Sequence, residues 1–134
     1  MFATKVTAKV VQDKSGVATE IPVILTDQGV LGSVTDYVLS LHLNGTSLST
    51  ITNHIQSIRL LIEFMDANEG MFHDPEELFA GFVRRLYSGT IGEDGLDPSG
   101  LYWIPASNST IHRHISNLTN FTNWLSDKGL GKHL

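Results

Sequence analysis

A seven-residue pattern occurs twice in this 134-residue chain and constrains its fold more than any other feature. The pattern is Ser-Thr-Ile, two variable residues and then His-Ile, and its copies occupy residues 49–55 and 109–115, which are 60 positions apart. Apolar residues recur at matching positions further along, for example Ile58 and Leu118. Hydroxyl residues followed by apolar residues at helical spacing indicate the start of an amphipathic helix. The sequence therefore predicts two similar helices, each with a polar first turn.

Composition narrows the classes of protein to which the chain can belong. Hydrophobic residues make up 41% and charged residues 17%, as in a globular domain with a modest core. Because cysteine is absent, disulfides and thiolate metal sites are excluded. No apolar run approaches the roughly 20 residues of a membrane span, and the first residues lack the apolar segment of a signal peptide. We therefore expect a cytoplasmic protein that has no membrane partner.

The net charge of −5 counts against strong binding of nucleic acid, but the charge is unevenly distributed. Residues 74–98 hold six acids and two arginines, a net charge of −4. Residues 109–134 hold three cations and one acid, a net charge of +2. The acidic excess therefore lies in the middle of the chain, and the last predicted helix is mildly basic.

Residues 1–29 are expected to form a β-hairpin or an extended arm. β-Branched residues alternate over residues 4–12, a turn sequence follows at 13–16, and an extended pattern resumes at 20–25. Pro22 would confine its strand to the edge of a sheet, because proline lacks the N–H that a second neighbouring strand would need. A lone hairpin is marginally stable in water, so this arm must pack on the helices or on a partner.

Residues 30–129 are expected to form a helical domain, so the predicted fold class is mainly α, a four-helix bundle that follows the hairpin or arm. Apolar spacing, N-caps and glycines predict helices at about 30–43, 48–68, 75–88 and 109–127. In the second helix, the inward face is expected to comprise Ile51, Ile55, Ile58, Ile62 and Met65.

The third helix has the clearest beginning and is followed by a long connection. Asp74 is a suitable N-cap, Pro75 fits the first helical position, and Gly89 is expected to end the helix. Residues 90–108 form a loop of a length that is usually either functional or disordered. Its apolar run at 101–104 is expected to pack back on the helices.

The first turns of the second and fourth helices are the main candidate for a binding site. Free N–H groups at a helix start, together with hydroxyl and amide side chains, suit contact with phosphate. Simple capping is the alternative, because serine and threonine are preferred N-caps in any helix. Capping requires one side chain per helix, whereas each turn here supplies several polar side chains, among them Ser47, Ser49, Thr50, Asn53, Ser109, Thr110 and Arg113.

Three histidines lie in or beside these turns. His54 and His114 occupy matching positions in the two copies, and His112 lies two residues before His114. Residues two apart point to different faces of a helix, and no acid stands at helical spacing to complete a ligand set, so no metal site is expected. We expect surface or groove-facing histidines that donate to phosphate.

Catalytic motifs are absent from the sequence. It contains no nucleophile elbow, P-loop or metal-ligand cluster, and Glu93, Asp94 and Asp97 lack the spacing of a calcium-binding loop. No cofactor, metal or small-molecule substrate is therefore expected, and we expect these residues to catalyse nothing by themselves.

Two stretches of the sequence resemble one protein family. They are Tyr37-Val38-x2-Leu41-x3-Gly45-Thr46-Ser47-x2-Thr50-Ile51-x6-Ile58-x5-Phe64 and Ser109-Thr110-Ile111-x-Arg113-x-Ile115-x2-Leu118-x2-Phe121-x2-Trp124-Leu125-x3-Gly129. They resemble the first half and the last helix of the core-binding domain of tyrosine recombinases, the phage-integrase family. The resemblance covers roughly residues 30–130. It implies a SAM-like helical bundle that packs on duplex DNA with its second and fourth helices against the grooves.

The resemblance also implies partners and a domain organisation. In this family a separate catalytic domain carries the nucleophilic tyrosine, so Tyr37, Tyr87 and Tyr102 are not candidates for that role, and residues 130–134 would begin the linker to that domain. Duplex DNA and other recombinase protomers would be the partners, in the nucleoid of a prokaryotic cell. The expected DNA-binding residues are Ser47, Ser49, Thr50, Asn53, His54, Ser109, Thr110, Arg113, His114 and Lys128.

A second hypothesis remains open. The acidity of the chain also fits a helical module that binds another protein and does not bind DNA.

Overall fold

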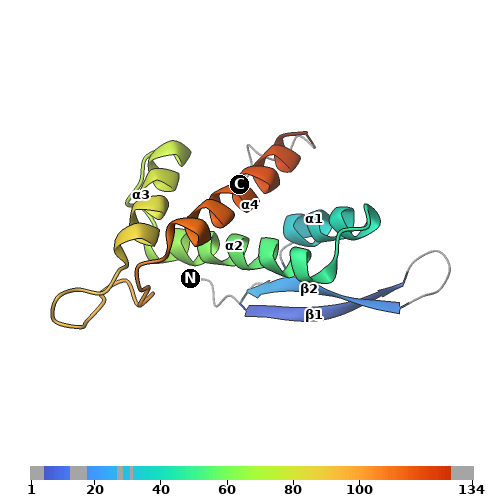
Figure 1. Ribbon diagram of the computed structural model, residues 1–134, viewed down its shortest axis with the longest axis horizontal. Helices are drawn as coiled ribbons and strands as arrows, with labels where there is room; N and C mark the ends of the chain where they lie inside the picture. Colours follow the sequence, from blue (N-terminus) through green and yellow to red (C-terminus); the bar gives the residue numbers. More distant parts are fainter. Residues whose placement is uncertain (1–4, 13–17, 27–28, 31, 128–134) are drawn as a thin grey trace. The chain divides into compact units, whose positions relative to one another are not determined.

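The computed structural model describes residues 5–12, 18–26, 29–30 and 32–127, and within these residues the chain is mainly helical (Figure 1). The described part contains four helices, which confirms the mainly α class and the expected number of helices. They are α1 (Gly32–Leu43), α2 (Leu48–Ala67), α3 (Pro75–Ser88) and α4 (Asn108–Asp127).

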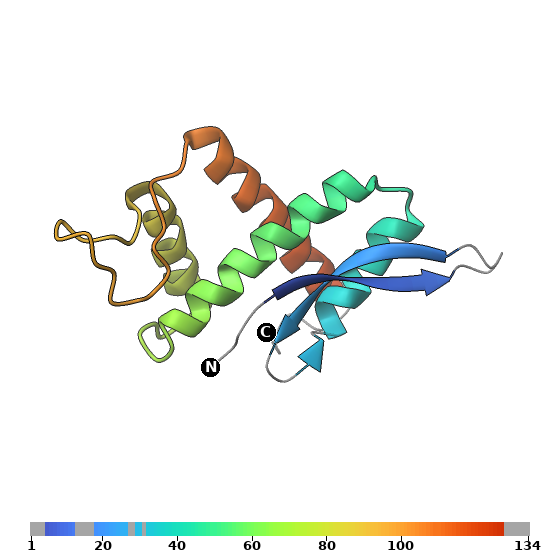
Figure 2. The same ribbon diagram turned by 90° about the horizontal axis from the view of Figure 1, so that it is seen from below.

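The N-terminal part of the structure contains an antiparallel sheet in the order β1-β2-β3. Its strands are β1 (Lys5–Gln12), β2 (Ala18–Thr26) and β3 (Gly29–Val30). Strands β1 and β2 run side by side along their length (Figure 2). Although β2 is the middle strand, Pro22 faces Ala8 of β1 and lies beyond the residues of β2 that pair with β3. Pro22 therefore has the local environment of an edge strand, which its missing N–H requires.

The chain divides into two compact units. One comprises residues 1–59 and 117–134 and is called the sheet unit; the other comprises residues 60–116 and is called the loop unit. Because the boundaries fall inside α2 and α4, each of these helices contributes one end to each unit.

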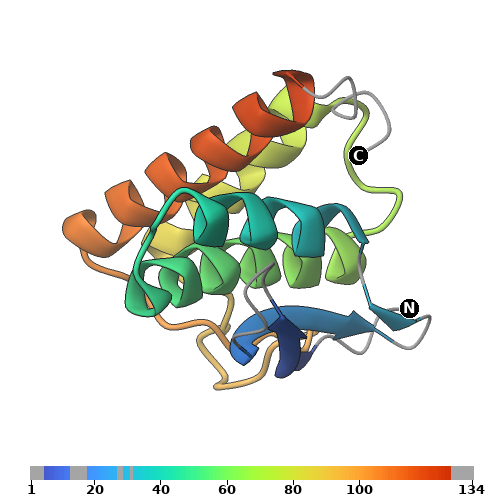
Figure 3. The same ribbon diagram turned by 90° about the vertical axis from the view of Figure 1, so that its right-hand side faces the viewer.

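The core of the sheet unit is built from helices and the sheet. Helix α1 contacts β2 and lies beside the first turns of α2 (Figure 3). Tyr37 of α1 is buried against the aromatic rings of α4, with ring centroids 5.0 Å from Phe121 and 5.3 Å from Trp124. Tilted aromatic contacts at these distances stabilise a core beyond the area that they bury. The remaining core side chains include Ile24, Val34, Val38, Ile51, Ile55, Ile58, Leu118 and Leu125.

A polar contact joins the two repeated helices inside this core. The side-chain amide of Asn117 donates to the Ser57 hydroxyl at 3.0 Å and to the backbone carbonyl of Asn53 at 3.3 Å. Ser57 is completely buried and occupies the position of the repeat that matches Asn117. Since a buried amide without a partner is destabilising, these hydrogen bonds account for a polar pair in an apolar core.

The core of the loop unit is an aromatic cluster around Phe64. The ring centroid of Phe64 lies 5.7 Å from Phe72, 5.6 Å from Phe82 and 5.9 Å from Trp103. Gly81 makes room for this cluster, because a Cβ at that position would lie 2.7 Å from the Phe72 ring. The buried positions in this half of α2 are Leu61 and Phe64, whereas Ile62 and Met65, which the sequence predicts to face inward, are only half-buried. The aromatic partners of Phe64 determine which side of the helix is buried here.

The expected beginning and end of α3 are confirmed. The Asp74 carboxylate accepts a hydrogen bond from the Glu77 N–H at 2.7 Å, and Pro75 occupies the first turn. Gly89 ends the helix with a φ of 74°, and its N–H donates to the Arg85 carbonyl at 2.8 Å. A Cβ on Gly89 would lie 2.7 Å from the Trp103 carbonyl oxygen, so glycine is required at this position.

The loop between α3 and α4 buries fewer residues of its apolar run at 101–104 than the sequence predicts. Trp103 joins the aromatic cluster and Leu101 is half-buried, but Tyr102 is 52% exposed and Ile104 is 75% exposed. The backbone pairs through Thr90, whose N–H donates to the Trp103 carbonyl at 3.0 Å and whose hydroxyl accepts from the Trp103 N–H at 2.8 Å. This pairing places Trp103 inward and leaves its two neighbours in solvent.

Candidate nucleic-acid interface

The first turn of α2 is capped by Ser47. The Ser47 hydroxyl accepts a hydrogen bond from the Thr50 N–H at 3.3 Å and donates to the Thr50 hydroxyl at 2.9 Å. The Ser47 carbonyl accepts the first helical bond, from Ile51, at 3.0 Å. Ser47 is therefore an N-cap, as the capping alternative predicts. Because the Thr50 hydroxyl accepts the hydrogen of Ser47, its own O–H is left to donate outward.

The first turn of α4 repeats this geometry with Ser107. The Ser107 hydroxyl accepts from the Thr110 N–H at 3.3 Å and donates to the Thr110 hydroxyl at 3.0 Å, and the Ser107 carbonyl accepts from Ile111 at 3.0 Å. The predicted start at Ser109 is therefore one residue late, and the sequence interpretation missed Ser107 as the cap. The signal was present, because Ser107 occupies the repeat position that matches Ser47.

Several polar side chains beside the two capping serines are exposed or half-buried. In the sheet unit Ser49, Thr50 and Asn53 are exposed. In the loop unit Ser109 and Arg113 are exposed, Thr110 is half-buried, and Ser109 approaches the cap hydroxyl at 3.2 Å. Each turn thus presents backbone and side-chain donors to solvent, as the start of a helix that binds an anion would.

Two of the three histidines in or beside these turns are buried, and His112 alone is exposed. His54 is 8% exposed and His114 is 6% exposed, so the prediction of surface or groove-facing histidines is wrong for both. Their spacing from Ile51, Ile55 and Ile111 places them on the buried side of each helix. The Nδ1 atom of His54 lies 3.3 Å from the Tyr37 hydroxyl.

Burial also determines the charge state of these two rings. It lowers the pKa of His54, because a charged imidazole loses its solvation there. It lowers the pKa of His114 in the same way, and the positive charge of Arg113 lowers that pKa further. Both histidines are therefore biased toward the neutral form, and their rings pack in the interior of the helical units.

Among the predicted site residues, Lys128 lies outside the described residues.

The charge around the two turns differs from that of the rest of the chain. No acid occurs from residue 37 to 62 or from residue 98 to 126, although the whole chain holds 14 acids. These two stretches contain the first turns of α2 and α4 and most of both helices. The solvent-facing side of α4 also carries polar residues that the sequence interpretation did not single out, namely Thr119, Asn120, Thr122 and Asn123. The absence of acids between Asp97 and Asp127 would have pointed to them.

No group of three or more histidine and acidic side chains is arranged to hold a metal ion among the described residues. None of the helices in the described ranges combines the length and the apolar composition that crossing a bilayer requires.

Comparison with protein-family models, with curated proteins and with solved structures finds no match to this chain.

Proposed function

We propose that this chain is a duplex-DNA-binding module of the core-binding type found in tyrosine recombinases, with a SAM-like helical bundle. The observation that carries the proposal is the repeated helix start. Two helices begin with the same Ser-x-x-Thr cap, and both caps leave exposed donors in stretches of sequence that contain no acid. Phosphate is the biological anion that such donors recognise at helix starts.

The electrostatics of the two stretches support a polyanionic partner despite the net charge of −5. A phosphate near either turn would meet no acid of the same stretch, and the partial positive charge of the helix start would attract it. Arg113 adds an exposed full charge one turn into α4. Few cations lie on these faces, so the affinity should be weak and should decrease as salt is added.

The family to which this proposal refers assigns cleavage and rejoining of DNA strands to a separate catalytic domain. The proposal therefore gives these 134 residues a binding role and no catalytic residue. Duplex DNA and further recombinase protomers are the proposed partners. Ser49, Thr50, Asn53, Ser109, Thr110 and Arg113 are the proposed contact residues, with Ser47 positioning Thr50.

The decisive experiment measures duplex binding by fluorescence anisotropy at several salt concentrations, with Arg113→Ala and a matched control. Arg84→Ala is the control, because Arg84 is an exposed arginine on α3. We expect Arg113→Ala to weaken binding and to reduce the salt slope by up to about one unit, whereas Arg84→Ala leaves both unchanged. An equal effect of both variants would remove Arg113 from the interface.

A second function has one observation in its favour. Leu43 is 79% exposed and Leu48 is 54% exposed, on either side of the connection between α1 and α2, and exposed apolar side chains are typical of protein-binding surfaces. A helical protein-binding module would retain no duplex even at low salt. The anisotropy titration of the unmodified chain therefore distinguishes the two functions.

A further inference from the structure

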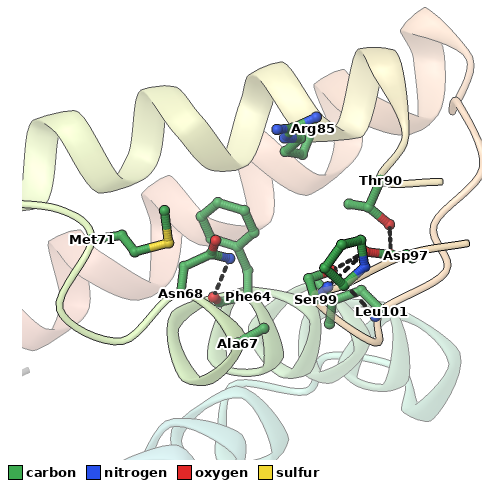
Figure 4. Close-up of a pocket in the computed structure, with 10 residues that line it drawn as sticks. Phe64, Ala67, Asn68, Met71, Arg85, Thr90, Asp97, Ser99 and Leu101 are labelled. Atoms are coloured by element: carbon green, nitrogen blue, oxygen red, sulfur yellow. Dashed lines mark hydrogen bonds between the residues drawn. The ribbon is translucent and has the colours of Figure 1, made fainter. Parts of the chain in front are cut away.

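The loop unit contains a cavity of about 290 Å³ between the end of α2, α3 and the loop that follows α3 (Figure 4). Its apolar walls come from Phe64, Ala67, Met71 and Leu101. Small-molecule sites are mostly apolar, contain a few fixed polar groups, and have volumes of roughly 300 Å³ and above. This cavity is at the lower end of that range, which suits a ligand of one or two rings.

One wall of the cavity is held in place by the Asp97 carboxylate. The Oδ1 atom accepts from the Ser99 N–H at 2.8 Å and from the Ser99 hydroxyl at 2.6 Å. The Oδ2 atom accepts from the Tyr102 N–H at 2.8 Å and from the Thr90 hydroxyl. Four donors occupy the lone pairs of a carboxylate, so Asp97 has no acceptor position left for a ligand. Asp97 therefore shapes the cavity and does not bind a cation in it.

The same hydrogen bonds keep Asp97 ionised. Burial alone would raise its pKa, but the hydrogen bonds from Ser99, Thr90 and Tyr102 outweigh that effect and hold the pKa well below its usual value. Tyr102 adopts a left-handed backbone conformation, with a φ of 53°, and donates its N–H to the Asp97 carboxylate. A non-glycine residue is rarely found in this region, so the surrounding hydrogen bonds must stabilise it. Hydrogen bonds within the loop therefore form this wall of the cavity without a ligand.

The opposite wall is also ordered. The Asn68 side-chain amide donates to the Phe64 carbonyl at 2.9 Å, which holds both residues in position (Figure 4). The Phe64 ring is buried in the aromatic cluster, so its orientation is fixed by its neighbours. Met71, in contrast, is 67% exposed. An exposed thioether beside a fixed ring is an adaptable contact for a flat apolar ligand.

Arg85 provides the cation of this site. Its side chain lines the cavity and is exposed, and within the described residues it forms no ion pair or hydrogen bond. A guanidinium binds a carboxylate through two parallel hydrogen bonds. No other lining residue carries a positive charge. An anionic group of a ligand would therefore be bound at Arg85 and would be kept away from Asp97.

We propose that this cavity binds a small planar aromatic acid, with its carboxylate on Arg85 and its ring against Met71 and Leu101. This site is separate from the proposed DNA-binding turns and does not depend on them. The sequence offers no indication of it, because its residues come from α2, the connection between α2 and α3, α3 itself and the following loop, and share no motif.

The test uses three probes that share one ring system: 2-naphthoate, its neutral amide and the corresponding methylamine. Each is titrated into the 15N-labelled chain, and amide shifts of Asn68, Thr90 and Ser99 are followed. We expect 2-naphthoate to bind with a Kd on the order of 1 mM. The neutral naphthamide probe should bind at least about fivefold more weakly than 2-naphthoate. The methylamine probe should not bind, because only the carboxylate of the acid pairs with a guanidinium.

Matched variants locate the bound probe. Arg85→Gln should weaken 2-naphthoate binding to the level of the amide, whereas Arg84→Gln should leave it unchanged, because Arg84 does not line the cavity. Ala67→Leu should fill the cavity and abolish binding, whereas Ala80→Leu on the exposed side of α3 should not. Equal binding of the three probes, loss with Arg84→Gln, or retention in a folded Ala67→Leu chain would each overturn the proposal.

Discussion

Helices α2 and α4 begin in the same way, and α3 begins differently. In all three helices a side-chain oxygen accepts a hydrogen bond from the N–H three residues later, at 3.3 Å for Ser47, 3.3 Å for Ser107 and 2.7 Å for Asp74. The cap of α3 is charged and is followed by Glu76 and Glu77, whereas the caps of α2 and α4 are neutral and no acid follows them in the first turn.

This difference at the helix start affects the stability of the helix and its capacity to bind an anion in opposite directions. A carboxylate cap and first-turn acids neutralise the partial positive charge of the helix start, which stabilises the helix and repels an approaching phosphate. A serine cap satisfies the backbone as well but leaves that charge available. Helix α3 therefore has the beginning of a purely structural helix, while α2 and α4 retain what an anion-binding helix needs.

The largest expected effect comes from giving α2 and α4 the acidic beginning of α3. Replacing both Ser49 and Ser109 by Glu should weaken duplex binding at least about tenfold, because two negative charges would then face the phosphates. The free energy of unfolding should stay the same or rise slightly, since acids suit a helix start. Anisotropy and urea unfolding measure the two quantities. As the control, Ser49→Gln with Ser109→Gln adds comparable length without charge. Loss of binding in the Gln variant would contradict an electrostatic cause.

The buried histidines are expected to make the repeated helices sensitive to acid. Burial lowers the pKa of His54 and His114 in the folded state, so below the unfolded value of about 6.5 the unfolded chain binds more protons than the folded chain. The free energy of unfolding should therefore decrease as pH falls below about 6.5, by at most about 1.4 kcal/mol per pH unit for each histidine. Urea unfolding between pH 7.5 and 5 measures this decrease.

A matched pair of variants assigns the pH effect to these rings. His54→Gln with His114→Gln should flatten the pH dependence, whereas His73→Gln should not, because His73 is exposed. A pH profile that is unchanged in the double variant would show that other groups cause the acid sensitivity.

The smallest expected effect is that of the caps themselves. Ser47→Ala and Ser107→Ala should each decrease the free energy of unfolding by about 1 kcal/mol, and Asp74→Ala by a similar or slightly larger amount. Because their capping geometry matches, Ser47→Ala and Ser107→Ala should agree closely with each other. Thermal or urea unfolding provides the measurement, with Ser126→Ala on the exposed end of α4 as a control. A large difference between the two serine variants would contradict the structural equivalence of the two turns.

The features that the sequence predicts correctly are local. Asp74, Pro75 and Gly89 fix the ends of α3 through backbone hydrogen bonds and a left-handed φ, and each of these signals acts within one or two turns. The apolar spacing of α2 and α4 predicts their extent for the same reason. The cap at Ser107 could also have been predicted, from its match to Ser47.

The features that the sequence does not predict depend on tertiary contacts. His54 is buried because Tyr37 of α1 lies against it, at 5.9 Å between ring centroids. Phe64 is buried more deeply than Met65 because Phe72, Phe82 and Trp103 surround it. The Asp97 hydrogen bonds join residues up to seven positions apart in a loop without regular structure. No apolar periodicity in the sequence therefore predicts them.

The most direct measurement is a map of amide chemical shifts in the 15N-labelled chain during titration with a short duplex at low salt. If the repeated helix starts bind phosphate, the amides of Ser49, Thr50, Ser109 and Thr110 will shift with one common Kd, and those of Glu76 and Glu77 will not move. Shifts centred on Glu76 and Glu77, or no shift at the four hydroxyl residues while duplex is bound, would contradict the account.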